Sequence, residues 1–280
     1  MNLNFYKYQG TGNDFVVVDD RNQLFDVNNH ELVAKLCHRR FGIGADGLML
    51  LQNSTQNNVG NNGESAKNGS DFHMIYFNAD GQQSSMCGNG GRCMVAFAKY
   101  LGIISEKTTF TAIDGVHEAQ IIDDVVSLKM NDVETVLQGK DFFFLNTGSP
   151  HYVCYVEAIE NYKVFEHGKV IRYSETYQPK GTNVNFISEI SADYLFVRTY
   201  ERGVEDETFS CGTGVTAAAI AHSIAKQHVK KTEKKTNTSR NHIKIKTLGG
   251  ELSVSFEFSD GKYHDIYLKG EAKLVFEGRY

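Results

Sequence analysis

The chain has 280 residues, 41% of them hydrophobic, and a formal net charge of −5 at pH 7. This length and composition fit one large domain or two ordinary ones and exclude a globally disordered protein. The acidic balance offers no general attraction for nucleic acid or for an anionic membrane, so we expect neither partner. No run of eighteen apolar residues occurs, and the first ten residues lack the basic-then-apolar plan of a signal peptide. We therefore expect a cytoplasmic protein.

The five cysteines are an odd number in a chain without export signals, which argues against a disulfide framework. No CxxC pair and no HExxH motif occurs, so we expect no metal site. Nothing in the sequence signals pyridoxal phosphate either, and we expect no cofactor.

The N-terminal segment NFYKYQGTGNDFVVVDD predicts two strands around a glycine turn. Asn13 lies at this turn, where a backbone-bonding role and a ligand-binding role are both open. The segment HELVAKLCHRRFG has helical spacing, Gly42 can end that helix, and Cys37 is expected to be a buried apolar residue.

The sequence GIGADG, residues 42–47, matches the GxGxxG pattern of dinucleotide-binding turns. That fingerprint requires a strand before the glycines and a helix after them. Here the predicted helix comes first and the strand-like LMLLQ follows, so we reject a dinucleotide site. The polar segment of residues 54–70 reads as a loop between two strands.

A glycine-rich turn then follows Cys87 and opens into an apolar run, MCGNGGRCMVAFAKYLG. Free backbone N–H groups and the positive end of a helix dipole would favour the thiolate of such a cysteine. Residues 108–130 predict an antiparallel meander. The second half repeats the plan: four strands lead to FSCGTGVTAAAIAHSIA, where Cys211 again precedes a glycine-rich helix start.

The remaining segments are a basic stretch, residues 227–242, and the C-terminal strands. The basic stretch contains no aromatic residues and reads as a solvated loop. We predict an α/β (α+β) fold of two quasi-equivalent halves, each a mixed sheet around one central helix. The halves are residues 1–131, joined by 268–280, and residues 132–267.

Two thiols on matching helix starts suit two-base proton transfer. One thiolate removes the proton alpha to a carboxylate, the other thiol returns a proton on the opposite face, and the helix amides stabilise the enolate-like charge. Three alternatives stay open at this point. The cysteines can be ordinary core residues, a redox pair, or part of a non-catalytic amino-acid-binding module.

Nine motifs spread along the chain resemble those of the diaminopimelate epimerase family: GTGNDFVVVD, GIGADGL, FNADG, CGNGGRC, GSPH, GTNVNF, YERG, CGTG and the terminal GEA. The resemblance implies two pseudo-symmetric domains, mostly antiparallel within each mixed sheet. It implies a cofactor-independent isomerase that interconverts LL- and meso-2,6-diaminoheptanedioate in lysine biosynthesis. A racemase of another amino acid on the same fold is the alternative, and a homodimer is one possible assembly.

By the same resemblance, Cys87 and Cys211 are the acid/base pair, and His151 and Glu201 tune their pKa values. Substrate-binding positions carried over in this way are Asn13, Asn78, Gly88, Asn89, Asn183, Glu201, Arg202, Gly212 and Thr213. Three departures affect the expected substrate geometry: Gly47 stands where some members have glutamine, Ser149 where many have asparagine, and YERGVEDET is one residue longer than the common pattern.

Overall fold

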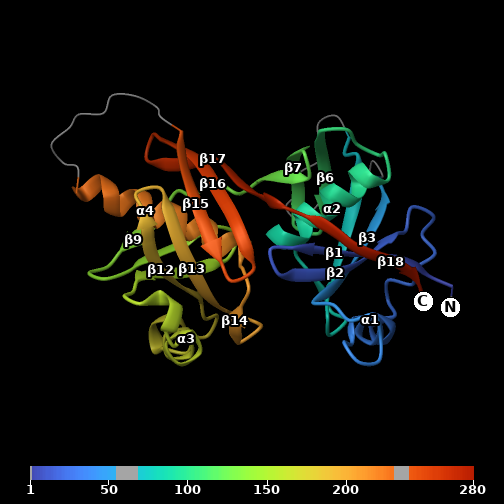
Figure 1. Cartoon of the computed structure of the whole chain (residues 1–280), viewed down its shortest axis with the longest axis horizontal. Coiled ribbons are helices and arrows are strands. Elements are labelled where there is room, and N and C mark those ends of the chain that lie inside the picture. Colours follow the sequence, from blue (N-terminus) through green and yellow to red (C-terminus); the bar gives the residue numbers. More distant parts are fainter. Residues whose placement is uncertain (1, 55–68, 230–239) are drawn as a thin grey trace. The chain divides into compact units, whose positions relative to one another are not determined.

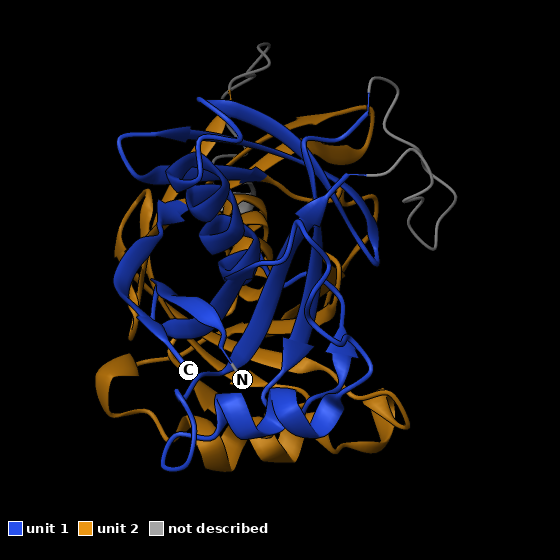
Figure 2. Ribbon diagram, turned by 90° about the vertical axis from the view of Figure 1, so that its right-hand side faces the viewer, with its two compact units in different colours: residues 1–128, 270–280 blue, residues 129–269 orange. Residues whose placement is uncertain are grey.

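The structure, a computed structural model, describes residues 2–54, 69–229 and 240–280. The predictions for the two polar loops therefore fall largely outside the described residues. The chain divides into two compact units: unit 1 is Met1–Leu128 with Gly270–Tyr280, and unit 2 is Lys129–Lys269 (Figure 2). The boundaries expected from the sequence, at residues 131 and 268, lie within three residues of these divisions.

The described residues of unit 1 contain two helices, α1 (His30–Cys37) and α2 (Gly88–Tyr100). Its strands are β1 (Asn4–Gly10), β2 (Asn13–Asp19), β3 (Gly47–Asn53), β4 (Phe72–Asn78), β5 (Gln83–Ser84), β6 (Lys107–Ala112), β7 (Gly115–Ile122), β8 (Val125–Lys129) and β18 (Lys273–Arg279).

The sheet of unit 1 runs in the order β18–β1–β2–β3–β4–β6–β7–β8. Two neighbouring pairs are parallel, β2 with β3 and β4 with β6, and the chain crosses over between them through α1 and α2. The other pairs are antiparallel, including the predicted return of the last strand to the first half, where β18 pairs with β1. Helix α2 contacts β1, β2, β3, β7 and β18, so the sheet surrounds it (Figure 1).

The described part of unit 2 contains α3 (Val164–Arg172), α4 (Gly212–Val229) and two short 3₁₀ turns, η1 (Ile159–Asn161) and η2 (Glu175–Tyr177). Its strands are β9 (Val136–Gln138), β10 (Phe143–Asn146), β11 (Pro150–Tyr155), β12 (Asn183–Ser191), β13 (Tyr194–Glu201), β14 (Asp206–Thr208), β15 (Asn241–Thr247), β16 (Gly250–Ser259) and β17 (Lys262–Glu271).

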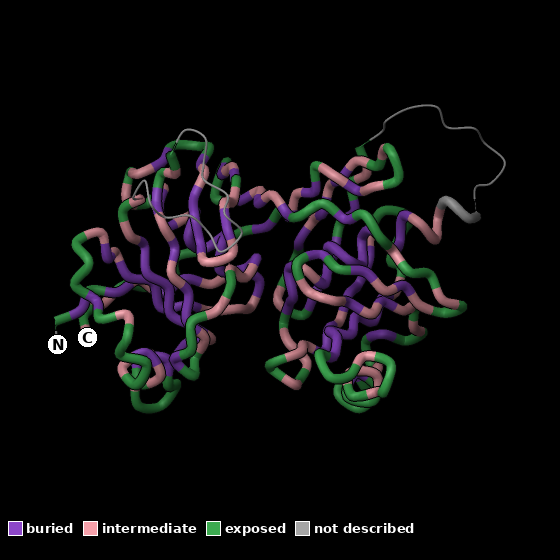
Figure 3. Tube along the Cα trace, turned by 180° about the vertical axis from the view of Figure 1, so that it is seen from behind, coloured by how far each residue is buried: buried purple, intermediate pink, exposed green. Residues whose placement is uncertain are grey.

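The strand order of unit 2 repeats that of unit 1. It runs β9–β10–β11–β12–β13–β15–β16, with β11/β12 and β13/β15 parallel and their crossovers made by α3 and α4. Helix α4 contacts β10, β11, β12, β13, β15 and β16. In both units the buried residues gather on the strands around the central helix (Figure 3). The predicted fold of two mixed sheets, each around one helix, is confirmed. None of the described helices is long and apolar enough to cross a membrane.

The predicted end of α1 at Gly42 is wrong, because the helix already ends at Cys37. His38 adopts an extended backbone, and its Nδ1 accepts the backbone N–H groups of Arg40 and Phe41 at 3.1 and 3.2 Å. This side-chain turn competes with continued helix. Cys37 is buried, as expected.

Helix α3 was not predicted by the sequence. Gly168 lies in its middle, and glycine lowers helix propensity by about 1 kcal/mol. The structure gives the reason for this residue: a Cβ at Gly168 would lie 2.4 Å from the Cβ of Tyr200 on β13. Close packing of the helix on the sheet therefore requires the residue that weakens the local signal.

Candidate functional site

The first predicted thiol, Cys87, is the N-cap residue of α2, with extended backbone and a partly exposed side chain. Gly88 and Asn89 form the buried first turn, and the helix closes with a bond from Gly91 N–H to the Cys87 carbonyl at 2.7 Å. A Cβ at Gly91 would lie 2.8 Å from Met86 Sδ. The glycines thus allow tight packing at the helix start, where the first N–H groups have no intrahelical partner.

Asn13 connects the start of β2 to this helix. Its Oδ1 accepts a hydrogen bond from Asn89 Nδ2 at 2.7 Å, and its Nδ2 donates to Asp46 Oδ2 at 2.8 Å. Asp46 belongs to the GIGADG motif that we reject as a dinucleotide site. This segment instead orients Asn13, a predicted binding residue. Asn78 ends β4 directly beside Gly47, and its carbonyl accepts from Gly81 N–H in the following turn.

A network of charged residues surrounds Asp14, the residue that follows Asn13. Asp14 forms ion pairs with Lys7 at 2.6 Å and with Arg39 at 2.7 Å, and Arg39 also reaches Asp46 at 2.6 Å. Burial opposes ionisation of Asp14, but the hydrogen bonds from Arg39 and Lys7 outweigh it and lower the pKa of this carboxyl to about 2. Sequence reasoning missed this network because its members come from three separate segments.

Arg92, in the second turn of α2, is fully buried. Its Nη2 donates to Thr11 Oγ1 at 2.6 Å and its Nη1 to the Gly88 carbonyl at 3.3 Å, and it forms no ion pair with any described residue. Burial lowers the pKa of this guanidinium, while the thiols of Cys93 and Cys87 act in the opposite direction. Arginine stays charged in proteins, so a permanent cation lies within electrostatic reach of Cys87. The sequence pattern, which reads as an apolar helix, gave no signal for it.

The second thiol, Cys211, precedes α4 and is 8% exposed. The Val215 N–H donates to its carbonyl at 2.9 Å, which repeats the closure seen at Cys87. Gly212 and Thr213 form the first turn, and Thr147 Oγ1 donates to the Thr213 carbonyl at 2.8 Å. Both predicted cysteine–helix starts are thus present, one in each unit, and all five cysteines are free thiols.

His151, at the start of β11, is linked to Cys211 through one hydroxyl. Its Nε2 lies 2.9 Å from Thr213 Oγ1, which lies 3.4 Å from Cys211 Sγ. His151 is fully buried. This burial, assisted by the positive charge of Arg202, lowers the pKa of the imidazole to about 3. At neutral pH the ring is therefore uncharged and carries one proton.

Arg202 and Asn183 form the other polar group of unit 2. Asn183 Oδ1 accepts the Arg202 backbone N–H at 2.9 Å, and its Nδ2 donates to Ser149 Oγ at 2.9 Å and to the Pro150 carbonyl at 3.1 Å. The Arg202 guanidinium contacts Ser149 Oγ and the Lys180 carbonyl, both at 3.3 Å. Within the described residues it has no carboxylate partner. Glu201 accepts a hydrogen bond from Thr208 Oγ1 at 2.9 Å.

The buried neutral His151 should make the folded state sensitive to acid. Its ordinary pKa of 6.5 applies in the unfolded chain and a value of about 3 in the folded chain, so the unfolded state binds the extra proton between these pH values. We expect the free energy of unfolding to fall as pH drops from about 6.5 towards 3, by up to about 5 kcal/mol from this group. Denaturant titrations at several pH values measure the slope.

In His151→Gln that part of the slope should disappear, whereas His242→Gln, which changes an exposed histidine on β15, should leave it unchanged. Equal slopes in His151→Gln and the parent chain would contradict the assignment.

Comparison with known proteins identifies the family of the chain. The family model described as diaminopimelate epimerase matches residues 5–136 and 143–275. The chain belongs to the diaminopimelate epimerase family. A diaminopimelate epimerase of Flavobacterium psychrophilum is 50% identical over 276 residues, covering 98% of this chain and 99% of the relative. One from Aquifex aeolicus is 39% identical, covering 99% and 97%.

Solved structures agree on the fold. A hydroxyproline epimerase from Agrobacterium vitis superposes with a TM-score of 0.64 at 15% identity, covering 99% of this chain and 92% of that one. A methylitaconate-delta-isomerase gives 0.64 at 13% identity, covering 100% and 95%. At these identities the likeness concerns the fold alone.

The departures from the diaminopimelate epimerase pattern have local explanations. A Cβ at Gly47 would lie 2.5 Å from the Phe77 carbonyl, so this backbone position has no room for a side chain as it stands. Ser149 places its hydroxyl between Asn183 and Arg202. The longer YERGVEDET segment forms a turn in which Glu205 has a φ of +59° and donates its N–H to the Glu201 carbonyl at 2.8 Å.

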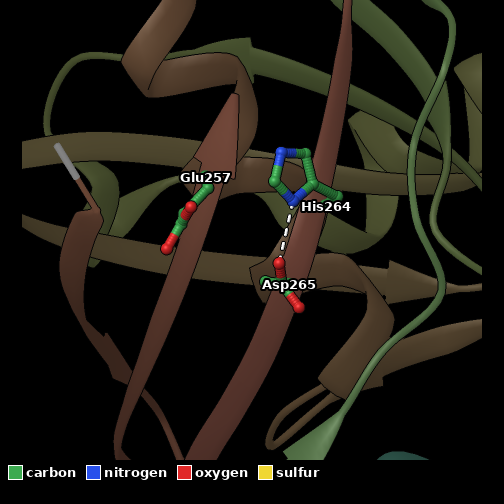
Figure 4. Close-up of side chains that lie close together, drawn as sticks. All are labelled: Glu257, His264 and Asp265. Atoms are coloured by element: carbon green, nitrogen blue, oxygen red, sulfur yellow. Dashed lines mark hydrogen bonds and ion pairs between the residues drawn. The ribbon is translucent and has the colours of Figure 1, made fainter. Parts of the chain in front are cut away.

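One cluster of metal-ligating side chains occurs among the described residues. Glu257 on β16 and His264 and Asp265 on β17 place ligand atoms within 4.8 Å of one another (Figure 4). Both imidazole nitrogens of His264 are occupied, Nδ1 by Asp265 Oδ2 at 2.9 Å and Nε2 by Ser259 Oγ at 2.8 Å. These hydrogen bonds account for the placement of His264 and Asp265, and the absence of a metal site stays a prediction.

Proposed function

We propose that the protein interconverts LL- and meso-2,6-diaminoheptanedioate by two-base proton transfer between Cys87 and Cys211, without a cofactor. The observation that carries this proposal is the repeated cysteine–helix start in a chain of the diaminopimelate epimerase family. The name of the relative from Flavobacterium psychrophilum, half identical over nearly the whole chain, supports the substrate. The route served would be lysine biosynthesis.

The chemistry follows from the helix starts. One cysteine, as thiolate, takes the α-proton and becomes a thiol. The other, as thiol, gives its proton to the opposite face of the same carbon and becomes a thiolate. The N–H groups of Gly88, Asn89, Gly212 and Thr213 are the donors proposed for the reacting carboxylate, whose negative charge grows as the proton leaves. The reaction requires both thiols to reach one α-carbon from opposite sides.

We assign the remaining polar residues to the carboxylate and ammonium group at the non-reacting end of the substrate. The forked guanidinium of Arg202 suits a carboxylate, Glu201 suits an ammonium group, and Asn13, Asn78 and Asn183 complete the proposed binding set. Asn183 donates both amide hydrogens to Ser149 and Pro150, and its Oδ1 accepts the Arg202 backbone N–H. We therefore propose that Asn183 also holds the turn at Arg202 in place. The proposed pKa-tuning role of His151 has the Thr213 hydroxyl as its route to Cys211.

Turnover in deuterated water tests the proposal. LL-2,6-diaminoheptanedioate should be converted to the meso form with solvent deuterium at the inverted α-carbon, read by NMR or mass spectrometry. A panel that includes proline, histidine and lysine decides between this substrate and the alternative of another amino-acid racemase. Faster inversion of any single-headed amino acid would overturn the substrate assignment.

The redox alternative makes the opposite demand on the thiols. Two-base transfer needs both cysteines reduced, so dithiothreitol should preserve or raise the activity. Activity that requires an oxidised pair would favour the redox reading. The cytoplasmic location expected from the sequence and the homodimer given as one possible assembly stay predictions, and sedimentation of the purified chain tests the second.

A further inference from the structure

We propose that Asn185 is a positioning residue that fixes the tautomer of His151 and so directs the Thr213 hydroxyl proton to Cys211 Sγ. The inference rests on the proposed role of Cys211 as an acid/base and extends it to a residue outside the proposed binding set. Asn185 is the second asparagine of the GTNVNF segment and is fully buried on β12.

The orientation of the Asn185 amide is determined by its neighbours. The Tyr152 carbonyl can only accept, so the amide atom 3.0 Å from it is the donor Nδ2. On the other side, Thr199 Oγ1 donates to Oδ1 at 3.0 Å. The second hydrogen of Nδ2 then points to His151 Nδ1, also at 3.0 Å. A Cβ at Gly214 would lie 2.3 Å from Oδ1, so α4 has glycine where this amide needs space.

The protonation of His151 follows from this orientation. Nδ1 receives a hydrogen from Asn185 and must be the unprotonated nitrogen. The buried ring is neutral, so its single proton is on Nε2. Nε2–H therefore donates to Thr213 Oγ1 at 2.9 Å. Because Thr213 Oγ1 accepts there, its own proton is available to Cys211 Sγ, at 3.4 Å.

The result is a hydrogen-bond chain with one direction, from Asn185 through His151 and Thr213 to the sulfur. A donor aimed at the sulfur stabilises the thiolate over the thiol. In the opposite tautomer, Nε2 would accept a hydrogen bond from the Thr213 hydroxyl. That hydroxyl would then no longer donate to Cys211 Sγ. The charged group facing His151 is Arg202, which also disfavours an imidazolium.

Unit 1 provides a comparison within the same molecule. The two units share strand order and register, with His151 and Phe15 each paired to the parallel neighbouring strand at its first residue. The positions that correspond are His151 with Phe15, Asn185 with Met49, and Thr199 with Tyr76. Phe15 and Met49 are buried apolar residues that donate no such hydrogen bonds.

The helix start of unit 1 packs against these apolar side chains in the same way. A Cβ at Gly90, which corresponds to Gly214, would lie 3.2 Å from Met49 Sδ and 3.6 Å from the Phe15 ring. Unit 1 is thus built without polar side chains at the two positions that correspond to His151 and Asn185. Packing alone does not require a buried asparagine and histidine behind Cys211.

Two measurements on the full chain test the inference, and neither depends on turnover. Long-range ¹H–¹⁵N correlation spectra of ¹⁵N-histidine protein report which nitrogen of His151 carries the proton. We expect protonated Nε2 and unprotonated Nδ1 at neutral pH. A proton on Nδ1 would overturn the proposal whether or not the protein epimerises diaminopimelate.

The second measurement is the pH dependence of iodoacetamide alkylation at Cys211, followed by peptide mass spectrometry. Asn185→Leu should move the midpoint up by about one pH unit and slow alkylation at pH 7 about tenfold, because a hydrogen bond to a charged group is weakened. Thr213→Val should do the same, and the double variant should add little further, since both act through one chain.

The matched control is Thr199→Val. It removes the contact at the other end of the Asn185 amide but keeps both Nδ2 hydrogen bonds, so the alkylation midpoint should not move. An unchanged midpoint in folded Asn185→Leu, or additive shifts in the double variant, would refute the chain. If Asn185→Leu does not fold, the parent spectrum and the Thr213→Val midpoint still decide the question.

Discussion

Replacing either Cys87 or Cys211 by alanine should reduce epimerisation by at least about a thousandfold, because each variant lacks one of the two proton-transfer groups. We expect inversion to be lost in both variants, since inversion needs a proton-transfer group on each face of the α-carbon. Rates are measured by NMR from LL and from meso substrate. The control is Cys154→Ala, which changes a thiol on β11 outside the proposed pair and should keep the parent rate.

The single-cysteine variants should also separate proton exchange from inversion. One remaining base can remove and return a proton on its own face, so each variant should exchange the α-hydrogen of one epimer with deuterated water without inverting it. The two variants should exchange opposite epimers, which assigns each cysteine to a face. An unaffected inversion rate in either variant would eliminate two-base transfer.

Arg202→Met should lower kcat/KM for diaminopimelate by about thirtyfold or more. Removing a cation that pairs with a bound carboxylate costs roughly 2–5 kcal/mol, and about 1.4 kcal/mol corresponds to tenfold. One observation supports this assignment. The hydrogen-bond partners of the guanidinium among the described residues are Ser149 Oγ and the Lys180 carbonyl, both at 3.3 Å, so no described carboxylate neutralises its charge.

The discriminating measurement compares diaminopimelate with lysine, which lacks the second carboxylate. The preference for the diacid should collapse in Arg202→Met. The matched control is Arg198→Met on β13, the strand that ends just before Arg202, because Arg198 is already paired with Glu207 at 2.6 Å. That variant should keep the preference. A preference retained in Arg202→Met would place the distal carboxylate on another residue.

Much of this fold is encoded locally. The alternation of NFYKYQG and NDFVVVD around Thr11–Gly12 predicts β1 and β2, and the Cys-Gly-x-Gly starts predict α2 and α4, because strand pattern and helix start each depend on residues a few positions apart. Local signals failed at two places. The His38 side chain ends α1 early, and Gly168 weakens α3 to fit beside Tyr200.

The sequence was sufficient to locate the two thiols at the helix starts and to identify the family, because the motifs are short and contiguous. The hydrogen-bond partners of the site residues depend on the tertiary structure. Asn13 meets Asp46 and Asn89, which lie 33 and 76 residues away, and His151 meets Thr213 at a separation of 62. Sheet register sets these meetings, and a slip of one residue would turn each side chain to the other face. No spacing within β12 could have shown that Asn185 directs a proton towards Cys211.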